Sequence, residues 1–191
     1  GIAPSHIRVN KNGIEIPNET FPNTGGNGRL RFGFVAGNEP GKGFIQIKAA
    51  FESLSSGNWE LIVVDHSNKM NGGKPFPDAV GGKGKVHFVE KYTAKTIDKF
   101  FGMIDVLLFP TQNPESFGLT VREALIRNKW VIASSSGGIE EAVHHGINGT
   151  LIPLSPDPLH LRIAIEKAIV DSEKLNGWTN PMRHNIRTLD Q

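Results

Sequence analysis

From residue 30 onward, short apolar runs alternate with longer stretches in which apolar and polar residues are mixed. The short runs are apolar at successive positions rather than at every second one, which is typical of strands buried on both faces of a parallel sheet. The pattern therefore predicts six strands, at residues 30–37, 61–64, 86–89, 106–109, 131–133 and 151–152.

The stretches between these runs carry apolar residues at steps of three and four, which is the spacing of one helix face. Helices are expected at about residues 44–54, 97–104 and 158–174, and also after the fourth and fifth apolar runs. Alternating strands and helices predict a doubly wound α/β fold, a Rossmann-like parallel sheet of about six strands with helices on both faces. Ligands bind such sheets beyond the carboxyl ends of the strands, so the loops that lead into helices are the candidate sites.

The amino-terminal part of the chain has a different composition. The turn signal Asn12-Gly13 and the Pro-, Asn-, Gly- and Thr-rich residues 17–28 predict an interdomain linker and lead-in segment over residues 1–29. We expect a Rossmann-like domain at 30–175 and a tail or helix at 176–191. Because the chain begins at Gly1 without a methionine and ends in polar sequence, we expect it to be part of a longer protein.

Composition excludes several classes of protein. The 191 residues are 38% hydrophobic and 21% charged, as in ordinary globular domains. A net charge of +2 with both signs interspersed offers no basic stripe for nucleic acid. There is no cysteine, so a disulfide scaffold and a thiolate nucleophile are excluded. No apolar run approaches the roughly 18 residues of a membrane-spanning helix.

The loop after the first strand, residues 37–43 with the sequence GNEPGKG, suits a phosphate. Its glycines allow close backbone approach, the following helix start offers N–H groups, and Lys42 supplies a cation. It is not a Walker A loop, because only three residues separate Gly37 from Gly41 and Gly43 follows the lysine. A tight turn with a solvated lysine explains the same residues equally well.

The loop after the fourth strand, residues 115–123 with the sequence ESFGLTVRE, combines two carboxylates with a helix start. The helix is expected to begin near Gly118 to Thr120, where an anion would meet free N–H groups next to Glu115. A sugar nucleotide matches this set, since hydroxyls need carboxylate acceptors and a diphosphate needs donors. Alternatively, Glu115 only offsets the helix dipole and Glu123 pairs with Arg127.

Three further loops carry weaker signals. Glu90, Lys91 and Tyr92, after the third strand, are placed to contact a nucleotide base or to cap the following helix, and capping is expected at Thr93. Residues 134–138 (SSSGG) suit phosphate or capping and predict a helix at 139–145, with His144-His145-Gly146 as its end. Glu141 and His144 have the spacing of one arm of a di-iron site. No second arm exists, so no metal site is expected.

Three segments together resemble the carboxyl-terminal, nucleotide-sugar-binding domain of family 4 retaining glycosyltransferases, which have the GT-B fold. They are LRFGFVAGNEPGKGF, DVLLFPTQNPESFGLTVREAL and VIASSSGGIEEAVHHGINGTLIP. The resemblance covers about residues 7–174. Each motif is weak alone, but two glutamates eight residues apart around Phe117-Gly118-Leu119, with glycine-rich loops before and after them, occur in the order typical of that family.

The resemblance implies a role for each site residue. Glu115 would bind hydroxyls of the donor sugar, Glu123 the ribose, and Lys42 the diphosphate, and these three are the catalytic candidates. The family usually has an arginine where this chain has Asn38; Arg122 or a lysine of residues 66–84 is a possible substitute. The full donor-binding set would be Gly37, Asn38, Gly41, Lys42, Gly43, Glu115, Ser116, Phe117, Gly118, Leu119, Thr120 and Glu123.

The resemblance also implies an activity and partners. The expected reaction moves a hexose from a UDP- or GDP-linked sugar to an acceptor hydroxyl with retention, in polysaccharide or glycoconjugate synthesis and without a cofactor or metal. The acceptor would lie in a missing amino-terminal domain, so these 191 residues alone are expected to transfer nothing. No nucleic acid partner is expected. The expected location is the cytoplasm, with membrane contact only through the missing half.

Two other functions fit the same residues. A sugar-nucleotide epimerase of GT-B-like fold would use similar phosphate loops. A non-catalytic, flavodoxin-like nucleotide-binding module would need only part of the site.

Overall fold

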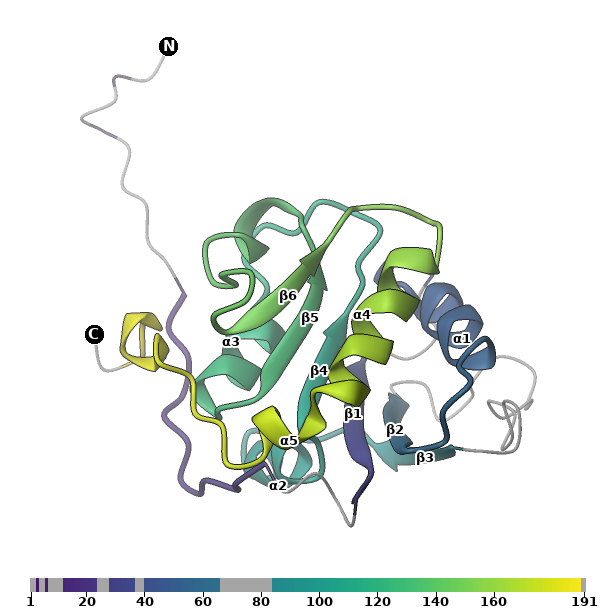
Figure 1. Cartoon of the computed structure of the whole chain (residues 1–191). Helices are drawn as coiled ribbons and strands as arrows, with labels where there is room; N and C mark the ends of the chain where they lie inside the picture. The colour runs from purple at the N-terminus through teal and green to yellow at the C-terminus, as the bar shows by residue number, and fades with distance from the viewer. Residues whose placement is uncertain are drawn as a thin grey trace.

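The computed structural model describes residues 3, 6, 12–23, 28–36, 40–65 and 84–189. Six parallel strands form one sheet in the order β3-β2-β1-β4-β5-β6, so the predicted doubly wound α/β fold is confirmed (Figure 1). The strands are β1 (Leu30–Val35), β2 (Trp59–Asp65), β3 (Lys85–Glu90), β4 (Val106–Phe109), β5 (Trp130–Ser134) and β6 (Gly149–Ile152).

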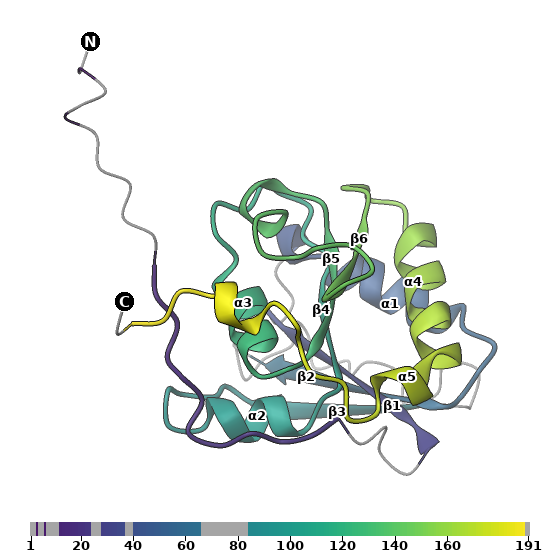
Figure 2. The same ribbon diagram turned by 60° about the vertical axis from the view of Figure 1, so that its left-hand side comes forward.

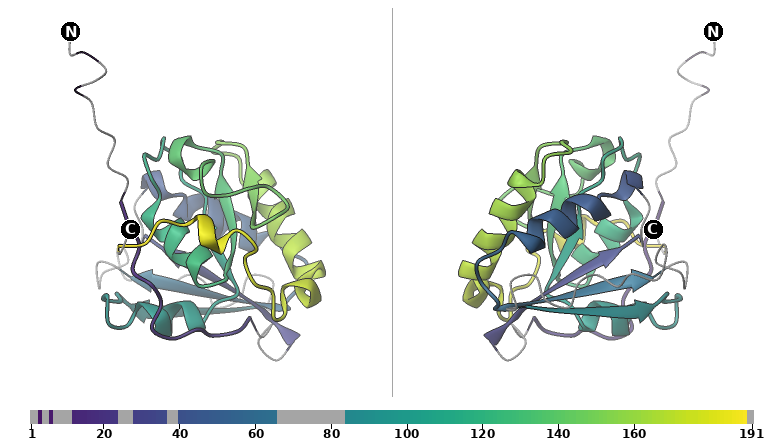
Figure 3. Two further views of the ribbon diagram at one scale, coloured as in Figure 1. Left: turned by 90° about the vertical axis from the view of Figure 1, so that its left-hand side faces the viewer. Right: turned by 90° about the vertical axis from the view of Figure 1, so that its right-hand side faces the viewer.

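The helices divide between the two faces of the sheet (Figures 2 and 3). On one face, α1 (Phe44–Glu52) and α4 (Leu159–Val170) pack on Phe32 and Phe34 of β1. On the other face, α2 (Ile97–Gly102) and α3 (Leu119–Ile126) pack on Leu107 of β4 and its neighbours. Because every residue of β4 is buried, its unbroken apolar run is explained by burial on both sides.

Side-chain volume sets the spacing of the layers at β1. Gly33 faces Ile104, and a Cβ added at Gly33 would lie 2.6 Å from Ile104 Cδ1. On the opposite face of the strand, the ring of Phe32 packs edge-on against Phe51 of α1, with ring centroids 5.5 Å apart. On one face, the missing side chain of Gly33 therefore leaves room for Ile104. On the other face, aromatic rings fill the space between β1 and α1.

Two predicted helices differ from the structure. The last helix is broken at Asp171 into α4 and the short α5 (Ser172–Leu175). The helix expected at 139–145 is wrong, because only a 3₁₀ turn, Gly137–Ile139, forms there. The side chain of Asn148 accepts a hydrogen bond from the His144 N–H and donates one to the carbonyl of Ala142, which ties this segment into a loop.

The predicted helix end at His144-His145-Gly146 is therefore also wrong. His145 instead accepts a hydrogen bond at Nδ1 from the Leu151 N–H of β6, over 3.1 Å. Gly146 has φ 79°, so it does take the left-handed conformation expected of it, but in a turn between the loop and β6 rather than after a helix.

The lead-in segment and the tail lie side by side (Figures 1 and 2). The N–H of Ile14 donates to the carbonyl of Arg187 over 3.0 Å, and the N–H of Leu189 donates to the carbonyl of Ile14. Ile14 and Ile186 are buried and extend the core on the α2 and α3 face. The lead-in segment and the tail thus contact each other at Ile14, and both pack on the α2 and α3 face of the domain. The division at residues 29 and 175 stays a prediction.

Candidate functional site

An open pocket of about 530 Å³ lies at the carboxyl ends of β1, β3 and β4. The sheet order reverses between β1 and β4, since the chain runs outward from β1 to β3 and then crosses back to start β4. This is the switch point at which doubly wound folds bind ligands. The described lining residues are Asn12, Val35, Ala36, Lys42, Lys91, Tyr92, Phe109, Glu115, Ser116, Phe117, Gly118, Leu119, Thr120 and Glu123.

Lys42 and Glu115 meet at this pocket from two different loops. Lys42 Nζ lies 3.3 Å from Glu115 Oε2, and both side chains remain partly exposed. The two loops are joined by the N–H of Gln112, which donates to the carbonyl of Gly41 over 2.9 Å. The pocket therefore holds a cation and a carboxylate that are both within reach of a ligand from solvent.

Gly43 allows the loop after β1 to lie against the loop after β4. Its φ is 87°, and an added Cβ would lie 2.0 Å from the carbonyl oxygen of Pro110. A side chain at this position would be strained by the backbone conformation and would also collide with the neighbouring loop. Gly41 is similarly close, because its added Cβ would lie 2.3 Å from Asn113 Nδ2. Gly41 and Gly43 thus shape the site without lining it.

The start of α3 points its backbone donors toward the same pocket. Gly118 precedes the helix with φ 72° and provides no side-chain cap. Within the described part of the chain, the N–H groups of Leu119, Thr120 and Val121 have no hydrogen-bond acceptor, as is usual for the first turn of a helix. These donors and the positive end of the helix dipole favour an anion at this position.

Glu123 lies one turn further along α3 and contacts the end of β3. The hydroxyl of Tyr92 donates to Glu123 Oε2 over 3.4 Å. Burial raises the pKa of the Glu123 carboxyl, and the Arg127 charge and the Tyr92 hydrogen bond oppose this rise. Burial, and then the negative charge of Glu123, raise the pKa of the Tyr92 hydroxyl. Tyr92 therefore lines the pocket as a neutral donor.

The alternative explanation, in which Glu123 pairs with Arg127, is wrong. Arg127 Nε donates to Asp98 Oδ1 over 2.6 Å, and Arg127 Nη1 donates to the backbone carbonyl of Glu123. The carboxylate of Glu123 is thus not used in that ion pair and stays available on the pocket side of α3.

The loop after β5 holds the site in place, a role that the sequence does not indicate. Ser136 Oγ accepts a hydrogen bond from the Glu115 N–H over 3.1 Å and donates one to the Asn113 carbonyl over 3.0 Å. The Gly138 N–H donates to the Glu115 carbonyl over 2.7 Å. An added Cβ at Gly138 would lie 2.2 Å from the Ser116 carbonyl oxygen, so this glycine allows the two loops to pack together.

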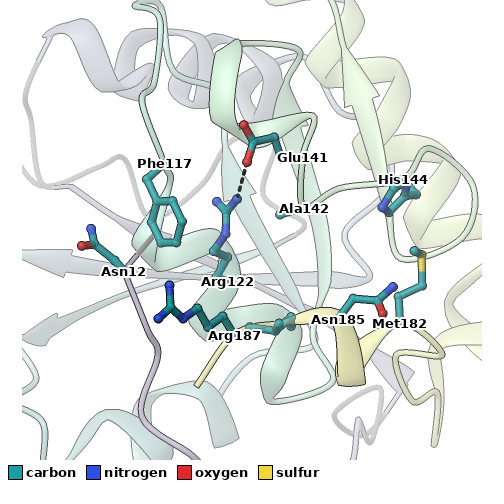
Figure 4. Close-up of a pocket in the computed structure, with 10 residues that line it drawn as sticks. Asn12, Phe117, Arg122, Glu141, Ala142, His144, Met182, Asn185 and Arg187 are labelled. Atoms are coloured by element: carbon teal, nitrogen blue, oxygen red, sulfur yellow. Dashed lines mark ion pairs between the residues drawn. The ribbon is translucent and has the colours of Figure 1, made fainter. Parts of the chain in front are cut away.

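Several expected contributors fall outside the described residues, namely Gly37, Asn38 and the lysines at positions 69, 74 and 83. Arg122 lines a separate small pocket, with its guanidinium 3.8 Å from the centroid of the Phe117 ring (Figure 4). Arg122 therefore does not replace the cation that Asn38 lacks, and Lys42 and Lys91 are the two lysines of the donor pocket among the described residues.

Among the described residues, no group of three or more His, Cys, Asp or Glu side chains could hold a metal ion. Within the same residues, no helix has the length and apolar character needed to cross a bilayer.

The family model for group 1 glycosyl transferases matches residues 16–184. The chain belongs to this family. Lipopolysaccharide 1,2-N-acetylglucosaminetransferase of Salmonella typhimurium is 29% identical over 154 residues, which is 71% of this chain and 38% of that protein. The chain spans less than half the length of the curated relatives it matches.

Solved structures share the fold of this group 1 glycosyl transferase domain. The Anabaena protein HepE in complex with UDP and glucose has a TM-score of 0.68 at 22% identity, over 84% of this chain and 45% of that one. The carboxyl-terminal domain of a group 1 glycosyl transferase from Francisella tularensis has a TM-score of 0.65 at 18% identity. That match covers 83% of this chain and 84% of the Francisella chain, so a domain of this extent has been crystallised by itself.

Proposed function

We propose that this domain binds the nucleotide diphosphate sugar of a family 4 retaining glycosyltransferase, which moves a hexose to an acceptor hydroxyl. The observation that carries the proposal is the pairing of Lys42 Nζ with Glu115 Oε2 at 3.3 Å, beside the uncapped start of α3. One pocket thereby offers donors for a diphosphate and acceptors for hydroxyls.

Each side chain has a distinct task in this proposal. Lys42 and the N–H groups at Gly118, Leu119 and Thr120 bind the diphosphate, and Lys42 exchanges its contact with Glu115 for phosphate oxygens. Glu115 then accepts hydrogen bonds from hydroxyls of the sugar. Glu123, held by Tyr92, accepts from the ribose. Ser116 and Phe117 complete the wall between the two carboxylates.

The chemistry assigned to the domain is electrostatic. When the bond between the sugar and the diphosphate breaks, negative charge grows on the leaving diphosphate. Lys42 and the helix-start amides stabilise that charge without a metal ion, because they are already oriented toward it. The glutamates orient the donor and do not act as nucleophiles, so the two-carboxylate scheme of glycoside hydrolases does not apply.

The assembly around this domain is also part of the proposal. We place the acceptor and the catalytic base in a domain amino-terminal to residue 1, since the chain spans less than half of its curated relatives. The name of the Salmonella relative and the HepE complex with UDP and glucose support a UDP-linked donor and a role in surface polysaccharide synthesis. A cytoplasmic location, with membrane contact through the preceding domain, follows from that role.

The donor assignment is tested by calorimetric titration of UDP and GDP into the chain and two lysine variants. Lys42→Gln removes one charge-assisted contact to phosphate, so the dissociation constant for the preferred nucleotide should rise about tenfold or more. Lys48→Gln is the matched control, because Lys48 is an exposed lysine of α1 that pairs with Glu52. Equal affinities in the wild type and both variants, or no binding at all, would remove the donor assignment.

Transfer is tested separately. The chain alone, incubated with the nucleotide sugar that it binds, should release no product, and adding a full-length relative's acceptor substrate should not change this result. A sugar altered in the absence of any acceptor would instead identify an epimerase.

A further inference from the structure

A separate pocket of about 310 Å³ lies at the amino ends of the strands, whereas the donor pocket lies at their carboxyl ends. It is formed where α4 passes the start of β5 and β6 (Figure 1). Trp130, the first residue of β5, and Thr150, near the start of β6, both line it. No described residue lines both this pocket and the donor pocket, so the two are distinct.

Two tryptophan rings form one corner of this pocket. The rings of Trp130 and Trp178 have centroids 5.2 Å apart and planes at 75°, and both side chains are half-buried. The indole N–H of Trp130 donates to Thr150 Oγ1 over 3.2 Å. The backbone N–H of Trp178 donates to the Leu175 carbonyl, and its carbonyl accepts from Asn23 Nδ2. These contacts hold both residues in place before any ligand arrives.

Small side chains of α4 leave the pocket open beside the two rings. Ala164 and Ala168 lie one turn apart on the helix, and both line the pocket. Larger apolar side chains at these positions would cover tryptophan surface and stabilise the fold by burial. The space that the alanines leave instead, about 310 Å³, is at the lower end of the roughly 300 to 1,000 Å³ that small-molecule sites occupy.

The rim of the pocket carries both charges. Asp171, between α4 and α5, accepts a hydrogen bond at Oδ1 from the ammonium group of Lys174. That bond keeps the pKa of Asp171 below its ordinary value, so the side chain is a carboxylate at neutral pH. No described residue donates to Oδ2, and the side chain is 31% exposed. A ligand in the pocket therefore meets an accessible acceptor, with the ammonium groups of Lys174 and Lys167 as donors.

From this geometry we propose that the pocket binds one pyranose ring of a saccharide. A pyranose has an apolar face of C–H groups, which packs on the electron-rich face of an indole, and hydroxyls at its edge, which need both donors and acceptors. The tryptophan corner provides the apolar surface, and Asp171 and the two lysines provide the polar groups. An apolar side chain of a partner protein would use the rings but would desolvate the carboxylate without replacing its hydrogen bonds.

The site would hold a saccharide away from the reaction. Members of this family transfer glycosyl groups, so saccharides are present where the domain works. The sugar being transferred is assigned to Glu115 at the other end of the sheet, and this pocket would bind a different residue of a glycan. A chain tethered there has a raised local concentration at the domain. The binding itself does not depend on the donor assignment, because Lys42 and Glu115 do not line this pocket.

The proposal is tested by NMR titration that follows the indole N–H signals. Trp59 is 1% exposed and lies outside the pocket, so its signal is an internal reference. Methyl glucopyranoside and methyl glucuronopyranoside, added separately at constant ionic strength, should shift the signals of Trp130 and Trp178 saturably at millimolar concentration. Saturation by both compounds indicates recognition of the neutral ring, and saturation by the glucuronide alone indicates that the lysines select an acidic saccharide.

Two results of this titration would overturn the proposal. The first is the absence of saturable shifts at Trp130 and Trp178 with both pyranosides. The second is saturation by N-acetylphenylalanine amide but by neither pyranoside, which would assign the pocket to a side chain of a partner protein.

Variants locate the binding within the pocket. Ala168→Leu fills the hollow without removing a ring or a charge, so it should weaken pyranoside binding at least tenfold. Val170→Leu is the matched control, because Val170 is 83% exposed on the same helix and does not line the pocket. Asp171→Asn should weaken binding about fivefold, since a neutral amide replaces the carboxylate.

UDP titrated into the same variants keeps this proposal apart from the donor assignment. All three variants should bind UDP as the wild type does, so a failure of UDP binding concerns the donor pocket alone. Wild-type affinity for the pyranosides in Ala168→Leu would show that the sugar lies elsewhere, and the proposal would fail. Should Ala168→Leu not fold, Asp171→Asn decides, because an unchanged affinity in that variant also removes the site.

Discussion

The hydroxyl of Tyr92 and the carboxylate of Glu123 join the end of β3 to the middle of α3 through one hydrogen bond of 3.4 Å. The two groups influence each other's ionisation. The negative charge of Glu123 contributes to the raised pKa of Tyr92, while the hydrogen bond from Tyr92 favours the ionised form of Glu123. Because Glu123 is partly buried, its ionised carboxylate lowers the free energy of unfolding of the domain.

Glu123→Gln should make the domain more stable at pH 7 and weaken its binding of nucleotide. Because burial raises the pKa of Glu123 in the folded state, the folded protein binds more protons than the unfolded chain just above pH 4.5, and stability falls as the carboxyl ionises. Glutamine keeps an acceptor for Tyr92 without the charge. The free energy of unfolding, measured by urea denaturation, should exceed the wild-type value at pH 7 and approach it on acidification.

The same variant should raise the dissociation constant for UDP about tenfold, through loss of a charge-assisted hydrogen bond to the ribose. Glu173→Gln, at an exposed position of α5, serves as the control for removal of one carboxylate. A Glu123→Gln domain that is less stable than the wild type at pH 7 would show that the ionised carboxylate is stabilising and would contradict this account.

Ser136→Ala should weaken donor binding although Ser136 does not line the donor pocket. The hydroxyl joins the Glu115 N–H to the Asn113 carbonyl, so its removal frees the loop that carries Glu115. We expect the dissociation constant for a nucleotide sugar to rise about fivefold to tenfold, with a smaller effect on UDP alone, because Glu115 is assigned to the sugar.

Ser135→Ala is the matched control, since the adjacent hydroxyl contacts Glu140 and not the site loop. Equal losses of affinity for UDP and for the nucleotide sugar would indicate a general loss of structure rather than a displaced Glu115. Thermal unfolding of both serine variants, measured in parallel, checks that point.

Gly43→Ala and Gly146→Ala separate backbone strain from collision. Both glycines have positive φ, 87° at Gly43 and 79° at Gly146. An added Cβ at Gly43 would lie 2.0 Å from the Pro110 carbonyl oxygen, whereas no atom lies within 4 Å at Gly146. Gly146→Ala should cost about 1 kcal/mol from the left-handed backbone alone, and Gly43→Ala should cost about 3 kcal/mol or more.

The comparison is made by urea denaturation of both variants. Gly43→Ala should also lose nucleotide binding under conditions in which it is still folded, because the loop that carries Lys42 must move away from Pro110. Equal destabilisation by the two substitutions would show that the loop after β1 can move away from Pro110 at no additional cost.

The fold could be predicted because its signals are local. The apolar runs of β1, β4 and β5 are short and mostly buried, so burial on both faces of the sheet explains them, whereas β3 at the sheet edge is largely exposed. The failed helix at 139–145 has the opposite origin. Its residues allow a helix, but the side chain of Asn148, outside the predicted segment, bonds to the backbone at Ala142 and His144 instead.

The site could be predicted only in part, for a similar reason. Lys42, Glu115 and Glu123 have side chains whose chemistry is visible in the sequence, and the switch point between β1 and β4 brings them to one pocket. Ser136 lies 21 residues from Glu115, and its contact exists only because β4 and β5 are neighbours. The contact of Arg122 Nη2 with the Gly138 carbonyl, 16 residues away, depends likewise on the loop after β5.

Lys129 should make the stability of the domain rise between pH 7.5 and 9.5. This lysine is buried, and its ammonium group donates to the Phe21 carbonyl and to Asn23 Oδ1, which holds the lead-in segment on the domain. Burial lowers its pKa to about 8. The unfolded chain therefore binds more protons than the folded protein above that pH, and the free energy of unfolding should increase by about 2 kcal/mol over this range.

In Lys129→Met that increase should be absent, whereas Lys48→Met, at an exposed lysine of α1, should keep it. Parallel stability curves for the wild type and Lys129→Met in urea denaturation would show that Lys129 stays fully protonated in the folded domain, with its charge offset by the two oxygen acceptors.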